Sequence, residues 1–205
     1  MSTLRKLFGP FKNEVWKQLA DEIKADYIDS SFWKGSKVQA TVNEWTITLD
    51  TFVVSTGKSA ITYTRMRAPY VNQDGFRFKI YRKGVFSNLG KWLGMQDVTV
   101  GQPEFDEQFI IQGNDETKLR LLFDNETIRQ LIEAQPSISL EVKDDDGWLS
   151  ASQFPEGVDQ LTFVVMGVIK DIERLKQLYE LFAEILNHLC QIGSAYENDP
   201  QVTLK

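Results

Sequence analysis

The sequence predicts an α+β fold, in which a largely antiparallel sheet carries an amino-terminal helix and a long carboxy-terminal helix on one face. Three observations support this prediction. Apolar residues recur every three or four positions near both ends of the chain, which is the helical period. Between residues 36 and 80 they recur at every second position, which is the period of a strand. No helical pattern interrupts that stretch, and successive strands without helices between them favour antiparallel pairing.

The first half of the chain begins with an amphipathic helix over residues 11–25, which follows Pro10 and buries one apolar face. Alternating apolar residues then predict strands over residues 38–42, 45–49, 52–54, 60–66 and 76–80. The pair Asn43-Glu44 can form the first hairpin turn, and the run from Asn72 to Gly75 carries a further turn signal. We therefore expect one meander of four or five strands, each paired with the next along the chain.

The second half mixes short strands with helices. Strands are predicted over residues 109–111, 138–142 and 161–166. Two short helices precede the second of these strands, because Asp115 and Asp124 are typical N-cap residues and Pro136 ends the second helix. The segment from Val85 to Gly94 is apolar and interrupted by glycine, and its pattern leaves a helical turn and a packed loop both open.

The clearest element is a long helix over residues 170–192, which ends at Gly193. Its apolar stripe is wide, which favours burial against the chain's own sheet over pairing with a coiled-coil partner. The polar tail of residues 196–205 is expected to be frayed. Residues 1–205 are long enough for one large core and show no linker or repeat, so they are predicted to form a single domain.

Composition excludes several classes of protein. With 42% hydrophobic and 25% charged residues, the chain is neither disordered nor membrane-spanning, and we expect a soluble, cytoplasmic protein. One cysteine and one histidine are too few for a disulfide framework, a Cys/His zinc site or most catalytic triads. We expect no cofactor and no dedicated metal site, and any metal would have to be a hard ion held by oxygen.

Two short motifs do not support a catalytic site. The run Gly57-Lys58-Ser59 is similar to the end of a phosphate-binding loop, but that loop needs a glycine five residues earlier, where this chain has Phe52. The run is therefore predicted to be a polar hairpin turn. His188 and Cys190 are two positions apart on a helix, so they point about 200° apart and cannot form a dyad.

Carboxylates offer the remaining route to catalysis. Asp97, Glu104 and Asp106 flank a loop over residues 101–103, and such groups can hold a divalent metal or act as an acid/base pair. One alternative function is therefore a carboxylate-based, divalent-metal-dependent hydrolase that uses Asp97 and Asp106. A chain with 29 acidic residues contains many such groups by chance, so this alternative ranks below a non-enzymatic function.

The distribution of charge is the most suggestive feature of the sequence. The whole chain carries −6, yet residues 51–96 hold eight basic residues and one acid, a net charge of +7 that leaves −13 for the remainder. Six of these basic residues are predicted to bind an anion or an acidic partner: Arg65, Arg67, Arg77, Lys79, Arg82 and Lys83. Tyr63 and Tyr81 lie among them, and arginine over an aromatic ring is common at anion-binding surfaces. Alternatively, the basic side chains cover the sheet and pair with acids elsewhere in the chain.

The run from Phe105 to Asn114, followed by Leu119 to Leu122, resembles a segment of uncharacterised bacterial protein families. The shared pattern is a Phe-Asp-x-x-Phe strand, a polar turn and a leucine-rich helix. It covers at most about half of the chain. The resemblance implies a bacterial cytosolic domain of unknown function and supplies no catalytic residue.

We therefore expect a non-enzymatic binding domain whose basic, aromatic strands engage an acidic protein partner or an anionic ligand. A specific nucleic-acid partner is not expected, because a net charge of −6 opposes binding to a polyanion. Self-association, with the basic strands of one copy against the acidic surface of another, is a further alternative. Phe86 and Trp92 offer a peripheral membrane contact as an alternative to burial. Reversing Arg77 and Lys79 to Glu is expected to abolish binding without lowering the melting temperature.

Overall fold

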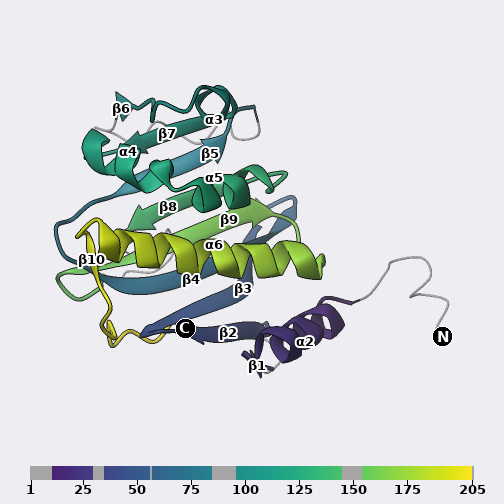
Figure 1. Cartoon of the computed structure of the whole chain (residues 1–205). Coiled ribbons are helices and arrows are strands. Elements are labelled where there is room, and N and C mark those ends of the chain that lie inside the picture. The colour runs from purple at the N-terminus through teal and green to yellow at the C-terminus, as the bar shows by residue number, and fades with distance from the viewer. Residues whose placement is uncertain (1–10, 30–34, 56, 85–95, 145–153, 205) are drawn as a thin grey trace.

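The computed structural model describes residues 11–29, 35–55, 57–84, 96–144 and 154–204 (Figure 1). The strands are β1 (Asp26–Ile28), β2 (Lys37–Val42), β3 (Trp45–Ser55), β4 (Ala60–Asn72), β5 (Phe78–Arg82), β6 (Gln96–Asp97), β7 (Phe109–Gly113), β8 (Ser139–Lys143), β9 (Val158–Met166) and β10 (Ala195–Tyr196). The helices are α2 (Lys12–Ile23), α3 (Pro103–Gln108), α4 (Glu116–Asp124), α5 (Glu126–Glu133) and α6 (Ile172–Gln191).

Within the described residues, all ten strands belong to one sheet. The order across it is β1-β2-β3-β4-β9-β8-β5-β7-β6, and β10 pairs with the end of β4. The strand pairings are antiparallel throughout. The predicted α+β class, with a large antiparallel sheet, is therefore confirmed.

The helices cover one face of this sheet, with α6 across the middle strands and α5 and α4 beside it (Figure 1). The first helix, α2, joins the same layer. Trp16 donates its indole N–H to the carbonyl oxygen of Ile169 at 3.1 Å, and Glu22 pairs with Lys176 of α6 at 2.5 Å. The amino-terminal and carboxy-terminal helices thus pack on the same face, as predicted.

The core lies between the helix layer and the sheet. Alternate residues of the central strands point into it and are fully buried: Leu49, Met66, Leu140, Leu161 and Phe163. The broad apolar stripe of α6 belongs to the same cluster, with Leu178, Phe182, Ile185 and Leu189 fully buried. Each such side chain contributes about 1.5–3 kcal/mol when it leaves water, which is what holds α6 on the sheet.

Side-chain caps set the starts of three helices. Asp115, Asn125 and Asp171 each accept a hydrogen bond from the backbone N–H three residues later, at the starts of α4, α5 and α6. The predicted cap Asp124 is instead the last residue of α4, and its neighbour Asn125 caps α5. Asp and Asn are equally good caps, so residue preference alone does not choose between adjacent positions.

The predicted meander ends at β4, and the prediction was wrong in placing the next strand beside it. Two later strands, β9 and β8, lie between β4 and β5. The turn signal itself is real, because the Asn72 side-chain oxygen accepts hydrogen bonds from the N–H groups of Asp74 and Gly75 at 3.3 and 2.9 Å. This turn carries the chain across the sheet instead of back along β4. Alternation identifies a strand but does not choose its neighbours, which depend on distant parts of the chain.

Candidate functional site

The second face of the sheet carries no helix within the described part of the chain, and we call it the helix-free face (Figure 1). Its side chains alternate with core residues along each strand. Each strand from β1 to β9 contributes one such side chain that lies directly opposite one on the neighbouring strand, so that a row runs across the whole sheet. This polar row consists of Asp26, Gln39, Thr48, Arg67, Thr162, Glu141, Lys79, Gln112 and Asp97.

The middle of the polar row is buried and its charges are paired. Nζ of Lys79 lies 3.2 Å from one carboxylate oxygen of Glu141, and Lys143 reaches the other oxygen at 2.6 Å. Arg67 is 1% exposed and binds Asp50 at 2.5 Å. Removing one partner of such a pair strongly destabilises a fold, because the other charge is left buried. These side chains therefore serve to hold the strands together.

The six basic residues predicted to bind a partner lie in different places. Arg65, Arg67 and Lys79 share the helix-free face. Arg77 lies at one end of the sheet, where it donates to Asp159 through Nε at 3.0 Å and to Asp144 through Nη1 at 2.8 Å. The hydrogen bond to Asp159 is the main reason why the pKa of Arg77 is raised above its usual value.

Arg82 and Lys83 instead contact residues of the helix layer. The guanidinium of Arg82 lies 4.6 Å from the centre of the Phe109 ring and donates to the carbonyl oxygens of Glu133 and Gln135 at 2.9 and 3.0 Å. Lys83 donates to the carbonyl oxygen of Asp106 at 2.9 Å. The +7 segment is thus divided among several sets of intramolecular contacts.

The two carboxylates of the hydrolase alternative also have structural partners. Asp97 accepts a hydrogen bond from the Gln112 side chain at 2.8 Å. Asp106 accepts three backbone N–H groups, from Val100, Gly101 and Gln102, at 2.9 to 3.0 Å, and so closes the loop before α3. Among the residues that the structure describes, no three acidic, histidine or cysteine side chains gather as metal ligands.

The lone histidine and cysteine lie on α6 and are each engaged locally. The ring nitrogens of His188 contact the Leu121 carbonyl oxygen at 3.0 Å and the Gln191 side-chain oxygen at 2.9 Å. Burial raises the pKa of the Cys190 thiol, which disfavours the thiolate that a nucleophile needs.

A different set of residues, four of them half-buried and one exposed, lies at one end of the helix-free face. Tyr63 on β4 lies opposite Phe52 on β3 and Met166 on β9, and Arg65 lies opposite Val164. The rings of Phe52 and Tyr63 stack with centroids 5.2 Å apart, and the Arg65 guanidinium lies 5.0 Å from the Phe52 ring. Met166 is 65% exposed. We call these five residues the arginine–aromatic surface.

Rigid neighbours fix this surface in place. Arg65 makes two parallel hydrogen bonds to Asp50, Nε to Oδ1 and Nη2 to Oδ2, both at 2.9 Å. The hairpin of β3 and β4 continues here past the last pairing with β2, which is Val38 with Leu49. The opposite side of the same hairpin exposes Val53 at 55%. Apolar side chains therefore reach solvent where the described neighbouring elements end.

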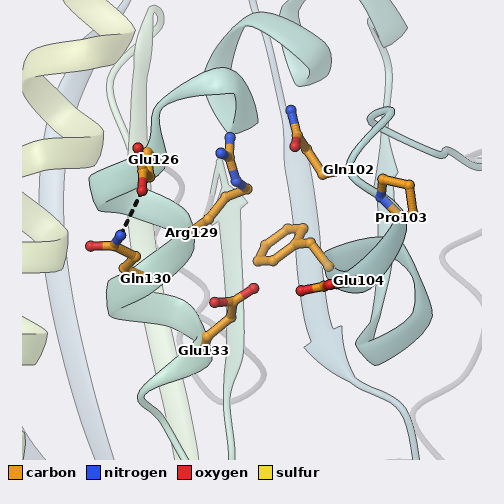
Figure 2. Close-up of a pocket in the computed structure, with 8 residues that line it drawn as sticks. Gln102, Pro103, Glu104, Glu126, Arg129, Gln130 and Glu133 are labelled. Atoms are coloured by element: carbon orange, nitrogen blue, oxygen red, sulfur yellow. Dashed lines mark hydrogen bonds between the residues drawn. The ribbon is translucent and has the colours of Figure 1, made fainter.

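A shallow pocket of about 360 Å³ lies between α3 and α5, and Figure 2 shows its lining. Its residues are Gln102, Pro103, Glu104, Phe105, Glu126, Arg129, Gln130 and Glu133. The carboxylates of Glu104 and Glu133 point toward each other, while Arg129 donates to the carbonyl oxygen of Phe123 at 2.5 Å. Carboxylates outnumber the single guanidinium, so this pocket does not favour an anionic ligand.

The membrane alternative rested on Phe86 and Trp92, which lie outside the described residues. Within the described chain, no helix is both long enough and apolar enough to cross a membrane.

No family model and no curated protein matches the chain. Its structure is similar to the crystal structure of the mycobacterial trehalose monomycolate transport factor A, TtfA, with a TM-score of 0.49 and 11% sequence identity. The alignment covers 86% of this chain and 95% of that chain. A likeness of this size assigns no function.

Proposed function

We propose that the chain is a non-enzymatic binding domain whose arginine–aromatic surface docks on an acidic protein partner. The observation that supports this most is the 65% exposure of Met166 beside the stacked rings of Phe52 and Tyr63. Methionine, aromatic residues and arginine are enriched where proteins bind one another, and tyrosine and arginine often dominate the binding energy. Ring stacking holds Phe52 and Tyr63 in place, and two hydrogen bonds to Asp50 hold Arg65, so these side chains lose little conformational entropy on binding.

The charge of the proposed partner follows from Arg65. Its Nε and Nη2 bind Asp50, whereas Nη1 has no hydrogen-bond partner among the described residues, and the side chain is 20% exposed. A carboxylate of the partner can reach Nη1 while an apolar side chain covers Met166 and Tyr63. The proposed partner segment therefore combines acidic and apolar residues.

Photocrosslinking followed by calorimetry tests this proposal. A photoreactive phenylalanine analogue at Tyr63 captures the partner in cells, and the same analogue at Leu121 is the control, because Leu121 is 49% exposed on α4. The captured protein is then purified. Its affinity is measured for the wild-type chain and for the Met166→Asp, Tyr63→Ala and Leu121→Asp variants.

We expect Met166→Asp and Tyr63→Ala each to weaken binding by at least about tenfold, as truncation of a central interface residue does. Leu121→Asp should leave the affinity unchanged, and all three variants should keep the wild-type melting temperature. Equal affinities for all four chains would exclude the arginine–aromatic surface as the binding site.

A further inference from the structure

After α6 the chain returns to the sheet and then runs onto its helix-free face. β10 pairs with the end of β4, and Asp199 then accepts a hydrogen bond from the N–H of Gln201, whose φ of +54° is left-handed. Residues 202–204 follow this turn and lie against Gln39 and Thr48, on the outer side of β2 and β3. We call residues 202–204 the tail strap. They belong to the segment that the sequence predicts to be frayed.

Two contacts hold the tail strap. The side chain of Leu204 is 5% exposed, although its neighbour Thr203 is open to solvent. Lys37 donates from Nζ to the carbonyl oxygen of Leu204 at 3.3 Å. Within the described residues, the strap makes no backbone–backbone hydrogen bond to a strand. It therefore lies on the sheet without extending it.

A polar groove borders the tail strap. It is a pocket of about 210 Å³, partly open to solvent, and residues 202–204 line it together with Gln39, Thr46, Thr48 and Pro69. Burial of Leu204 and the hydrogen bond from Lys37 hold the strap beside this groove.

We propose that this groove on β2–β4 is a peptide-binding site that the tail strap fills in the isolated chain, and that an extended segment of a protein partner replaces the strap. The strap defines the chemistry of the ligand. It needs a branched aliphatic side chain in the place of Leu204 and a backbone carbonyl for Lys37. This site does not depend on the arginine–aromatic surface, because Thr48 and Phe52 are about 14 Å apart along β3.

A tethered occupant competes strongly with a free one, since a short linker gives an effective concentration in the millimolar range. The test therefore uses the full chain with Leu204→Asp, which removes the aliphatic anchor of the strap. A synthetic peptide with the sequence of residues 198–205 is titrated into this variant and into the wild-type chain. A peptide with Asp in place of its leucine is the matched control.

We expect the Leu204→Asp chain to bind the natural peptide at least about tenfold more tightly than the wild-type chain does. Neither chain should bind the control peptide, and adding Lys37→Ala to the Leu204→Asp chain should weaken binding of the natural peptide. Equal binding by both chains, or no binding by a folded Leu204→Asp chain, would overturn the proposal. A Leu204→Asp chain that does not fold would overturn it as well, because a replaceable strap cannot be essential to the core.

Discussion

Carboxylates from later strands hold the basic side chains of the β4–β5 region. Asp159 of β9 binds Arg77 and is itself 3% exposed, and Glu141 of β8 pairs with Lys79. Both pairs join residues far apart in the sequence. Lys79 therefore connects β5 to β8, and Arg77, the residue before β5, connects the start of that strand to β9. Because a carboxylate neutralises each cation, its positive charge contributes little to the field outside the molecule.

A charge reversal tests this role. We predict that Arg77→Glu combined with Lys79→Glu lowers the melting temperature. Each introduced carboxylate would face the carboxylate that the replaced cation neutralises in the wild-type chain. Breaking one buried ion pair destabilises a protein by about 3–5 kcal/mol, and facing like charges add to that loss.

The measurement is thermal unfolding followed by circular dichroism. Lys58→Glu is the control, since Lys58 is exposed in the turn between β3 and β4. A double variant that melts with the wild type would show that these pairs do not stabilise the sheet, and would agree with the expectation from the sequence alone.

At the scale of the element, the hydrophobic period predicts those helices and strands that are long enough to repeat it. The long helix is predicted over residues 170–192 and is α6, Ile172–Gln191, because its 20 residues repeat the helical period several times. The three residues of β1 are too few to show a period, and this strand is not predicted. Interpreting the Phe-Asp-x-x-Phe run as a strand is wrong for residues 105–108: they belong to the six-residue helix α3, and the strand begins only at Phe109. The place of β5 beside β7 and β8 depends on pairings that no local pattern contains.

The same limit applies to the candidate site. Arg65 and Tyr63 are singled out by the sequence through charge and aromatic character. Phe52 and Met166 are predicted only as strand residues, because alternation does not tell where the neighbouring elements end. A usable signal exists: Phe52 shares its strand parity with Asp50, so both side chains point away from the core.

The junction of β7 with α4 depends on a glycine. A Cβ at Gly113 would lie 2.8 Å from Cδ1 of Leu119 and 3.0 Å from the carbonyl oxygen of Arg77. We predict that Gly113→Ala destabilises the chain by about 1–3 kcal/mol, as overpacking of a core does. Chemical denaturation measures this change. In the Gly113→Ala, Leu119→Ala double variant the loss should be smaller than the sum of the single losses, and strict additivity would contradict the clash.

At the scale of the whole molecule, the two faces of the sheet differ in what covers them. One face is closed by helices over an apolar core. The other carries the buried polar row, the tail strap and the arginine–aromatic surface. A binding function belongs on the second face, because a ligand there need not disturb the core.

Global stability should depend on alkaline pH. Burial raises the pKa of Tyr70 and Tyr179 above the usual value of 10.0, and Tyr179 also donates to the carbonyl oxygen of Val38 at 3.1 Å. The unfolded chain loses these protons near pH 10, whereas the folded chain keeps them at higher pH. Their contribution is therefore complete below about pH 10 and declines above it, by about 1.4 kcal/mol per pH unit for each phenol.

Denaturant unfolding at a series of pH values, followed by circular dichroism and tyrosinate absorbance, measures this decline. We expect Tyr179→Phe to make the slope above pH 10 shallower. An unchanged slope in Tyr179→Phe would contradict the assignment.

The position of β9 has a consequence for biosynthesis. This strand lies at the centre of the sheet between β4 and β8, and the Asn72–Asp159 hydrogen bond beside it joins residues 87 apart. Until residues 158–166 leave the ribosome, β4 and β8 present open edges to other nascent chains. Closing so long a loop is slow, and unpaired edges aggregate. The chain is therefore most vulnerable after β8 has been synthesised and before β9 has, and chaperones that shield strand edges should act in that interval.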